Sequence, residues 1–176
     1  YGSFSVIENN GSEIARRLGR EIVVSHIATR SIKEHQHIGE VKVSQDVMAV
    51  ADDPEVDIVL ELIGGYDLAK ELVLRAISNG KHVVTANKAL IAVHGNEIFS
   101  AASEKNVVVA YEAAVAGGIP IIKALREGLA ANHIQWLAGI INGTGNFILS
   151  EMGDKGSEFA NVLKQAQDLG YAEADP

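Results

Sequence analysis

The sequence predicts an α/β protein built on a doubly wound parallel sheet. Three short apolar segments have strand character, residues 57–63, 81–85 and 106–111, and segments with apolar residues at helical spacing, 66–79 and 94–105, separate them. Strands and helices that alternate in this way are typical of βαβ units, in which parallel strands are buried between helices on both faces. With 176 residues, the chain is long enough for one complete domain or for one domain and part of another.

Shorter elements are predicted before these units. Residues 1–19 are expected to form a helix with a break near Asn9-Asn10-Gly11. Residues 21–28 are rich in β-branched side chains and predict a strand. Residues 29–45 are polar and irregular, and residues 46–51 predict a short helix.

The pattern changes after Tyr111, and we place a domain boundary near residues 111–118. Beyond it, Pro120 occupies the first turn of an expected helix, a position that proline favours. The remaining expected elements are a strand over 134–141, a loop at 142–145, and helices around 147–152 and 158–169.

Composition and charge exclude several classes of partner. The formal net charge is −8, with acidic residues spread along the chain, which argues against nucleic acid and anionic membrane surfaces. No apolar run approaches the roughly 20 residues that span a bilayer. The absence of cysteine fits a reducing compartment, so we expect a cytoplasmic protein. The first residue is Tyr1 and the last Pro176, and both ends suggest a piece of a longer protein.

The ends of two successive strands hold the best candidates for a ligand site. Open α/β sheets bind ligands beyond the carboxyl ends of their strands. The first of these strands ends in Ile63-Gly64-Gly65, where missing Cβ atoms would let the backbone approach a flat ring or a phosphate. The second is followed by Thr85, Asn87 and Lys88, a hydroxyl, an amide and a cation. The plainer alternative is a simple turn and the start of the next helix.

Arg30 follows the strand predicted over 21–28, and Lys33 is close to it. A cation at this point of a dinucleotide-binding fold suits a 2′-phosphate, although a solvated charge is the commoner fate of such a residue. The glycine fingerprint of these folds, G-x-G-x-x-G, is not present in the chain.

Several long motifs resemble those of homoserine dehydrogenase, in order and over essentially the whole chain. They are VVTANKALIA at residues 83–92, YEAAVAGGIPIIKAL at 111–125, IINGTGNFIL at 140–149 and AQDLGYAEADP at 166–176, with EIARRLGR at 13–20. The resemblance implies NAD(P)-dependent interconversion of aspartate-4-semialdehyde and homoserine, in threonine and methionine biosynthesis, by a cytoplasmic homodimer. It also implies a truncated Rossmann-like nucleotide-binding domain at residues 1–111, followed at 112–176 by the start of an α+β substrate and dimerisation domain.

The resemblance also assigns roles to individual residues. Lys88 would lie beside the nicotinamide and the substrate, with a catalytic role, and Glu173 would bind the substrate amino group. The resemblance thus adds Thr85, Asn87 and Lys88 to Arg30, Ile63 and Gly64 as the residues that we expect to bind the cofactor, NADP or NAD. A monovalent cation such as Na⁺ would be bound largely by backbone carbonyl groups, at Glu112, Val115, Gly117 and Ile119.

Two features of the family are expected outside this chain. The glycine fingerprint would precede Tyr1, and the lysine that acts as general acid/base would follow Pro176, so we expect the 176-residue chain alone to be inactive. Two alternatives stay open from the residues: another oxidoreductase that acts on a different amino-acid-derived carbonyl, and a nucleotide-binding or regulatory module without catalysis.

Overall fold

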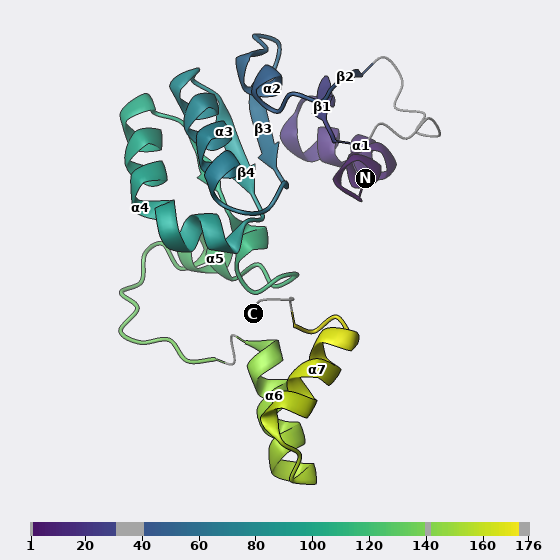
Figure 1. Cartoon of the computed structure of the whole chain (residues 1–176). Helices are drawn as coiled ribbons and strands as arrows, with labels where there is room; N and C mark the ends of the chain where they lie inside the picture. Colours follow the sequence, from purple (N-terminus) through teal and green to yellow (C-terminus); the bar gives the residue numbers. More distant parts are fainter. Residues whose placement is uncertain (1, 31–40, 140–141, 173–176) are drawn as a thin grey trace. The chain divides into compact units, whose positions relative to one another are not determined.

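The computed structural model describes residues 2–30, 41–139 and 142–172. They belong to two compact units, Tyr1–Gly128 and Leu129–Pro176, and each is considered by itself (Figure 1). No helix in the described ranges has the length and apolar character needed to cross a bilayer.

A three-stranded parallel sheet forms the centre of the first unit. Its strands are β3 (Ile58–Glu61), β4 (His82–Thr85) and β5 (Val109–Ala110), in the order β3-β4-β5. Ile58 pairs with His82, and Val83 pairs with Val109. The predicted α/β fold with parallel strands is therefore confirmed.

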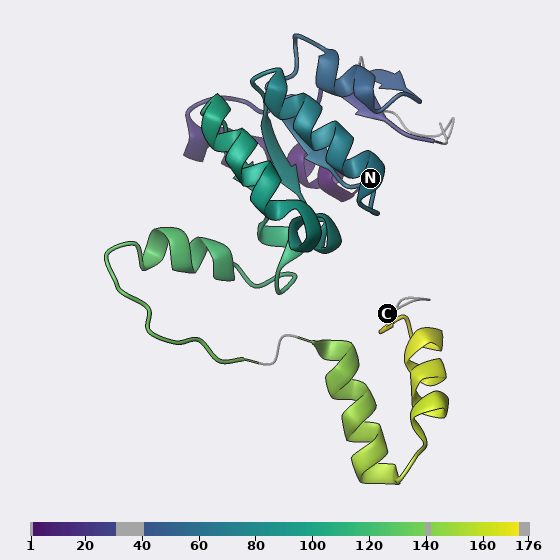
Figure 2. The same cartoon turned by 60° about the vertical axis from the view of Figure 1, so that its left-hand side comes forward.

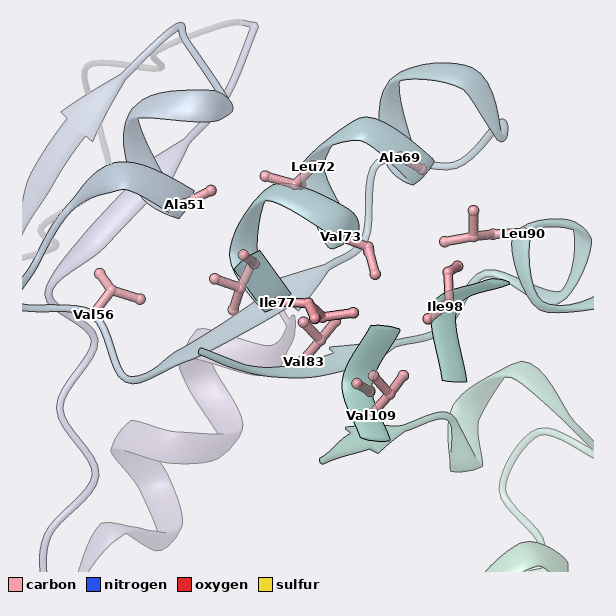
Figure 3. Close-up of a cluster of buried hydrophobic side chains, with 13 residues drawn as sticks. Ala51, Val56, Ala69, Leu72, Val73, Ile77, Val83, Leu90, Ile98 and Val109 are labelled. Atoms are coloured by element: carbon pink, nitrogen blue, oxygen red, sulfur yellow. The ribbon is translucent and has the colours of Figure 1, made fainter. Parts of the chain in front are cut away.

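Two helices cover one face of this sheet. They are α3 (Asp67–Ser78) and α4 (Lys88–Lys105), which lie side by side in Figure 2. The core between sheet and helices contains Val59, Val83 and Val109 from the strands and Leu72, Val73, Ile77, Leu90 and Ile98 from the helices (Figure 3). On the opposite face, Ile58, Leu60 and Val84 stay 37–47% exposed, so the second covering layer that the pattern predicts is incomplete in the described residues.

A separate two-stranded parallel sheet consists of β1 (His26–Ala28) and β2 (Lys42–Ser44). The prediction of a strand over 21–28 is wrong for residues 21–25, because β1 pairs with β2 over only three residues. The prediction that residues 29–45 are irregular missed β2, which is only three residues long, although Val41 and Val43 alternate with polar residues there. The short helix α2 (Met48–Asp52) follows and packs against β1 and α3.

Helix boundaries differ from the sequence predictions at two points. The first helix, α1 (Gly2–Leu18), has no break at Asn9-Asn10-Gly11, and the Asn10 side-chain amide donates a hydrogen bond of 2.9 Å to the Val6 carbonyl within it. Helix α4 begins at Lys88 rather than near residue 94, because the Asn87 side chain caps it. A local hydrogen bond thus adds almost two turns to the expected helix.

The end of the first unit contains short helical segments. They are the 3₁₀ helix η1 (Glu112–Ala114), the helix α5 (Ile121–Lys123) and the π-helix η2 (Ala124–Gly128). The helix predicted after Pro120 is present, but its second half has π geometry.

The second unit contains a helical hairpin, α6 (Gly143–Lys155) and α7 (Phe159–Asp168), with Ile148, Val162 and Ala166 as its core. The predicted loop at 142–145 is wrong, since Asn142 caps α6 through a hydrogen bond of 2.6 Å from the Gly145 amide. Of the strand predicted over 134–141, residues 134–139 have no strand structure, and 140–141 lie outside the described residues. A strand needs a pairing partner, and Trp136, 80% exposed, has none among the described residues.

Candidate functional site

The carboxyl ends of β3 and β4 meet at one edge of the sheet, because Glu61 pairs with Thr85 in the parallel register. Beyond Glu61 the chain passes through Gly64 and Gly65, whose φ angles of +72° and +68° favour glycine. A Cβ atom at either glycine would meet no other atom within 4 Å. These glycines are therefore required by the backbone conformation, and they leave open space beside the loop.

Hydrogen bonds join this loop to the segment that follows β4. The Thr85 hydroxyl donates to Oε2 of Glu61 at 2.6 Å, and the Ile63 amide donates to Oε1 of the same carboxylate at 2.9 Å. The Asn87 side-chain amide donates to the carbonyl of Gly65. The structure thus brings together Ile63, Thr85 and Asn87, three of the residues expected to bind the cofactor.

Asn87 uses its side chain for two purposes. Besides its bond to Gly65, its Oδ1 accepts a hydrogen bond of 3.0 Å from the Leu90 amide, which caps α4. Its own backbone amide donates to Oγ1 of Thr85 at 3.0 Å. The capped helix begins at Lys88, whose side chain is exposed at the same edge of the sheet.

Glu61 was not identified from the sequence, although its carboxylate is fully buried at the centre of these contacts. A usable signal was present. In the segment DIVLELI, Glu61 follows Val59 by two residues, so strand alternation places both on the same buried face. A buried acid at the end of a parallel strand marks a candidate functional position.

Arg30 lies in a different part of the first unit, two residues beyond the end of β1. Its side chain is exposed, and within the described ranges no hydrogen bond or ion pair joins it to another residue. Lys33, the second cation of the sequence prediction, is outside the described residues.

The segment expected to bind a cation is a compact turn. The Glu112 carboxylate accepts hydrogen bonds from the amides of Ile122 at 3.0 Å and Lys123 at 2.8 Å. The backbone of Ala116 adopts a φ of +47°, unusual for a residue other than glycine. The Glu112 side chain therefore joins the start of this turn to residues of α5.

The carbonyl groups of this turn differ in their partners. Those of Glu112 and Ile119 each accept one backbone hydrogen bond, whereas those of Val115 and Gly117 accept none from the described part of the chain. Hard oxygen donors of this kind fit an alkali-metal ion. Within residues 2–30, 41–139 and 142–172, no cluster of three His, Cys, Asp or Glu side chains could hold a metal ion.

Asp53 is the centre of a second charged cluster, away from the strand ends. Its carboxylate accepts hydrogen bonds from the Glu55 amide at 3.0 Å and the Lys42 ammonium at 3.0 Å, and Oδ2 lies 2.9 Å from Nδ1 of His26. These contacts, led by the Glu55 amide, lower the pKa of Asp53 from 3.8 to about 2. The buried Lys81 ammonium donates to the carbonyls of Asp53 and Val56, each at 2.6 Å, so this cluster ties β1 and β2 to the segment before β3.

Glu173, expected to bind the substrate amino group, lies outside the described residues.

Comparison with known proteins connects this geometry to a family. The model for the NAD-binding domain of homoserine dehydrogenase matches residues 3–112, more than half of the 176-residue chain. This chain belongs to the homoserine dehydrogenase family. A second homoserine dehydrogenase model matches residues 120–176.

Individual homoserine dehydrogenases match the chain along its length. That of Pseudomonas aeruginosa is 67% identical over 175 residues, 99% of this chain and 40% of the relative. That of Neisseria gonorrhoeae is 59% identical over 176 residues, again 99% of this chain and 40% of the relative. The chain thus spans about 40% of the length of these curated relatives.

Solved structures give the same result. The homoserine dehydrogenase of Thiobacillus denitrificans has 62% identity and a TM-score of 0.89, over 99% of this chain and 41% of that one. A hyperthermophilic archaeal homoserine dehydrogenase in complex with NADPH has 26% identity and a TM-score of 0.68, over 95% of this chain and 48% of that one. The segment that matches the NAD-binding domain of the family, residues 3–112, lies within the first unit.

Proposed function

We propose that the protein containing this chain interconverts aspartate-4-semialdehyde and homoserine with NAD(P), in threonine and methionine biosynthesis, and that residues 1–111 supply part of its nucleotide-binding domain. The observation that carries the proposal is the hydrogen-bonded pair of loops at the ends of β3 and β4, within the segment that matches the NAD-binding model. Residues 112–176 would begin the substrate and dimerisation domain.

Ile63 and Gly64 would contact the cofactor from one loop, and Thr85, Asn87 and Lys88 from the other. The open space beside the two glycines fits a flat ring that approaches the backbone closely. When bound, the cofactor supplies the hydride, and the protein supplies position and charge. Arg30, at the end of β1, would bind a 2′-phosphate and favour NADP over NAD.

Lys88 would stabilise the oxygen of the reacting carbonyl. Its ammonium is carried on the first residue of α4, where the helix dipole is already positive. The ammonium and the partial positive charge of the helix N-terminus would together favour a developing alkoxide.

Glu173 would fix the other end of the substrate, since a carboxylate pairs with an α-ammonium group. Glu112, Val115, Gly117 and Ile119 would bind a monovalent cation such as Na⁺ through oxygen atoms. The carbonyls of Val115 and Gly117, which accept no hydrogen bond from the described residues, support this assignment. We assign the ion a structural role, and we expect the full-length protein to be a homodimer.

The proposal is tested by steady-state kinetics of the full-length protein with homoserine and either NADP or NAD, followed through the absorbance of the reduced nicotinamide. Oxidation of homoserine, with little activity on other amino-acid-derived alcohols, supports it. Cofactor binding without turnover of homoserine would contradict it.

A further inference from the structure

We propose that Glu61 is a positioning residue for this reaction, because its carboxylate holds the two loops at the strand ends in a single arrangement. The inference rests on the proposed function, since it assigns these loops to the nicotinamide end of the cofactor. It adds a residue that does not touch the substrate but acts through Thr85 and Asn87.

The two oxygen atoms of Glu61 have separate partners. Oε1 accepts the Ile63 amide at 2.9 Å, and Oε2 accepts the Thr85 hydroxyl at 2.6 Å. One buried side chain therefore contacts both the loop after β3 and the segment after β4. Movement of either segment would break one of these bonds.

A chain of hydrogen bonds joins the start of α4 to Glu61, and each donor in it points toward Glu61. The Asn87 amide donates to Oγ1 of Thr85, and the single hydroxyl hydrogen of Thr85 is then given to Glu61. Asn87 also donates to the Gly65 carbonyl and caps α4. Lys88 is the next residue, so the chain of bonds that starts at Glu61 sets the backbone position from which its ammonium extends.

This arrangement requires two acceptors at position 61. A glutamine would present an amide oxygen to one partner and an NH₂ group to the other. If the NH₂ group met the Ile63 amide, two donors would face each other. If it met Thr85, the threonine oxygen would accept twice and its own hydrogen would lose its acceptor. Either choice leaves a buried donor without a partner.

Stability alone does not account for an acid at this position. Val59 and Val83 fill the same buried face of the sheet without a desolvation cost, and an apolar side chain could do so at position 61. What the carboxylate adds is a defined relation between the loop at 62–65 and the segment at 85–88.

The experiment compares Glu61→Gln, Thr85→Val and Thr85→Ser in the full-length protein. Serine keeps the hydroxyl of Thr85, whereas valine keeps its shape and removes both the donor and the acceptor. Glu104→Gln is the matched control, because Glu104 is exposed on α4. Readouts are kcat and KM for homoserine, NADPH titration, thermal melts, and amide hydrogen exchange in peptides covering residues 62–65 and 85–88.

We expect Glu61→Gln and Thr85→Val to lower kcat by about ten-fold to a hundred-fold, as small displacements of reacting groups do, and to change KM less. Amide hydrogen exchange should rise in the two peptides. Thr85→Ser should show a smaller loss of kcat and a smaller rise in exchange than Thr85→Val, and Glu104→Gln should resemble the wild type. If Glu61→Gln does not fold, the comparison of Thr85→Val with Thr85→Ser still tests whether the bond between Thr85 and Glu61 positions the two loops.

Wild-type kinetics and exchange in Glu61→Gln would overturn the inference, as would equal losses in Thr85→Ser and Thr85→Val. A loss of kcat that only follows the fraction unfolded would also overturn it, because it would assign Glu61 to folding alone. If the wild type does not oxidise homoserine, the proposed function fails, while hydrogen exchange and NADPH titration still test the role of Glu61.

Discussion

Oδ2 of Asp53 lies 2.9 Å from Nδ1 of His26, a residue 27 positions earlier in the chain. The same oxygen accepts the Lys42 ammonium, so one carboxylate contacts both strands of the β1–β2 sheet. Since Arg30 follows β1, this cluster supports the part of the unit to which we assign recognition of the 2′-phosphate.

The cluster should make stability depend on pH. The pKa of Asp53 is lowered from 3.8 to about 2 in the folded chain, so its contribution is complete above the unfolded value and is lost as the pH falls through the folded value. In thermal melts between about pH 2 and pH 6, the melting temperature of Asp53→Asn should fall less steeply with decreasing pH than that of the wild type. Asp57→Asn, at an exposed residue, serves as the control and should show the pH dependence of the wild type. If the melting temperatures of the wild type and Asp53→Asn depend on pH in the same way, the cluster adds no pH-dependent stability.

Gly64 should matter for cofactor binding as well as for folding. Gly64→Ala places a side chain at a φ of +72°, which costs about 1–2 kcal/mol. Gly80→Ala is the matched control, because Gly80 has a φ of +76° at the end of α3. Both variants should have melting temperatures that are lower by similar amounts. Only Gly64→Ala should weaken the binding of NADPH, as measured by fluorescence titration. Equal NADPH affinity in the two variants would remove Gly64 from the cofactor site.

Arg30→Ala should raise the KM for NADP and leave that for NAD nearly unchanged. A charge-assisted hydrogen bond contributes roughly 1.5–3 kcal/mol, so the change should be about ten-fold to a hundred-fold. Arg20→Ala, at another exposed arginine, serves as the control. If Arg30→Ala affects both cofactors equally, Arg30 does not recognise the 2′-phosphate.

Glu173→Gln should raise the KM for homoserine by about ten-fold or more, because the amide keeps the size of the side chain but loses its charge. 4-Hydroxybutyrate lacks the α-ammonium group, so its turnover should be almost the same in the variant and the wild type. Glu158→Gln, at the exposed residue before α7, is the control. An equal loss with both substrates would argue against a pairing between Glu173 and the ammonium.

The sequence was informative where structure depends on local patterns. Apolar residues at helical spacing located α3, and short β-branched segments located β3 and β4. The long motifs at 83–92 and 111–125 carried the family resemblance, which the family models confirm.

The errors arose where structure depends on partners. Lys42–Ser44 is a strand only because it pairs with β1, and residues 134–139 lack strand structure although their sequence suits it. The role of Asn87 as a helix cap moved the start of α4, and Glu61 escaped notice because its importance lies in contacts with Ile63 and Thr85. Such contacts join separate elements, so hydrophobic periodicity does not reveal them.

The most direct test of the proposed function is the turnover number of Lys88→Ala in the full-length protein with homoserine and saturating NADP. We expect kcat to fall about 10²-fold and NADPH affinity to change much less, because the ammonium is needed most when charge develops on the substrate oxygen. Lys105→Ala, at the exposed last residue of α4, should behave like the wild type. Oxidation of homoserine at the wild-type rate by Lys88→Ala would contradict the assignment of the active site to the ends of β3 and β4.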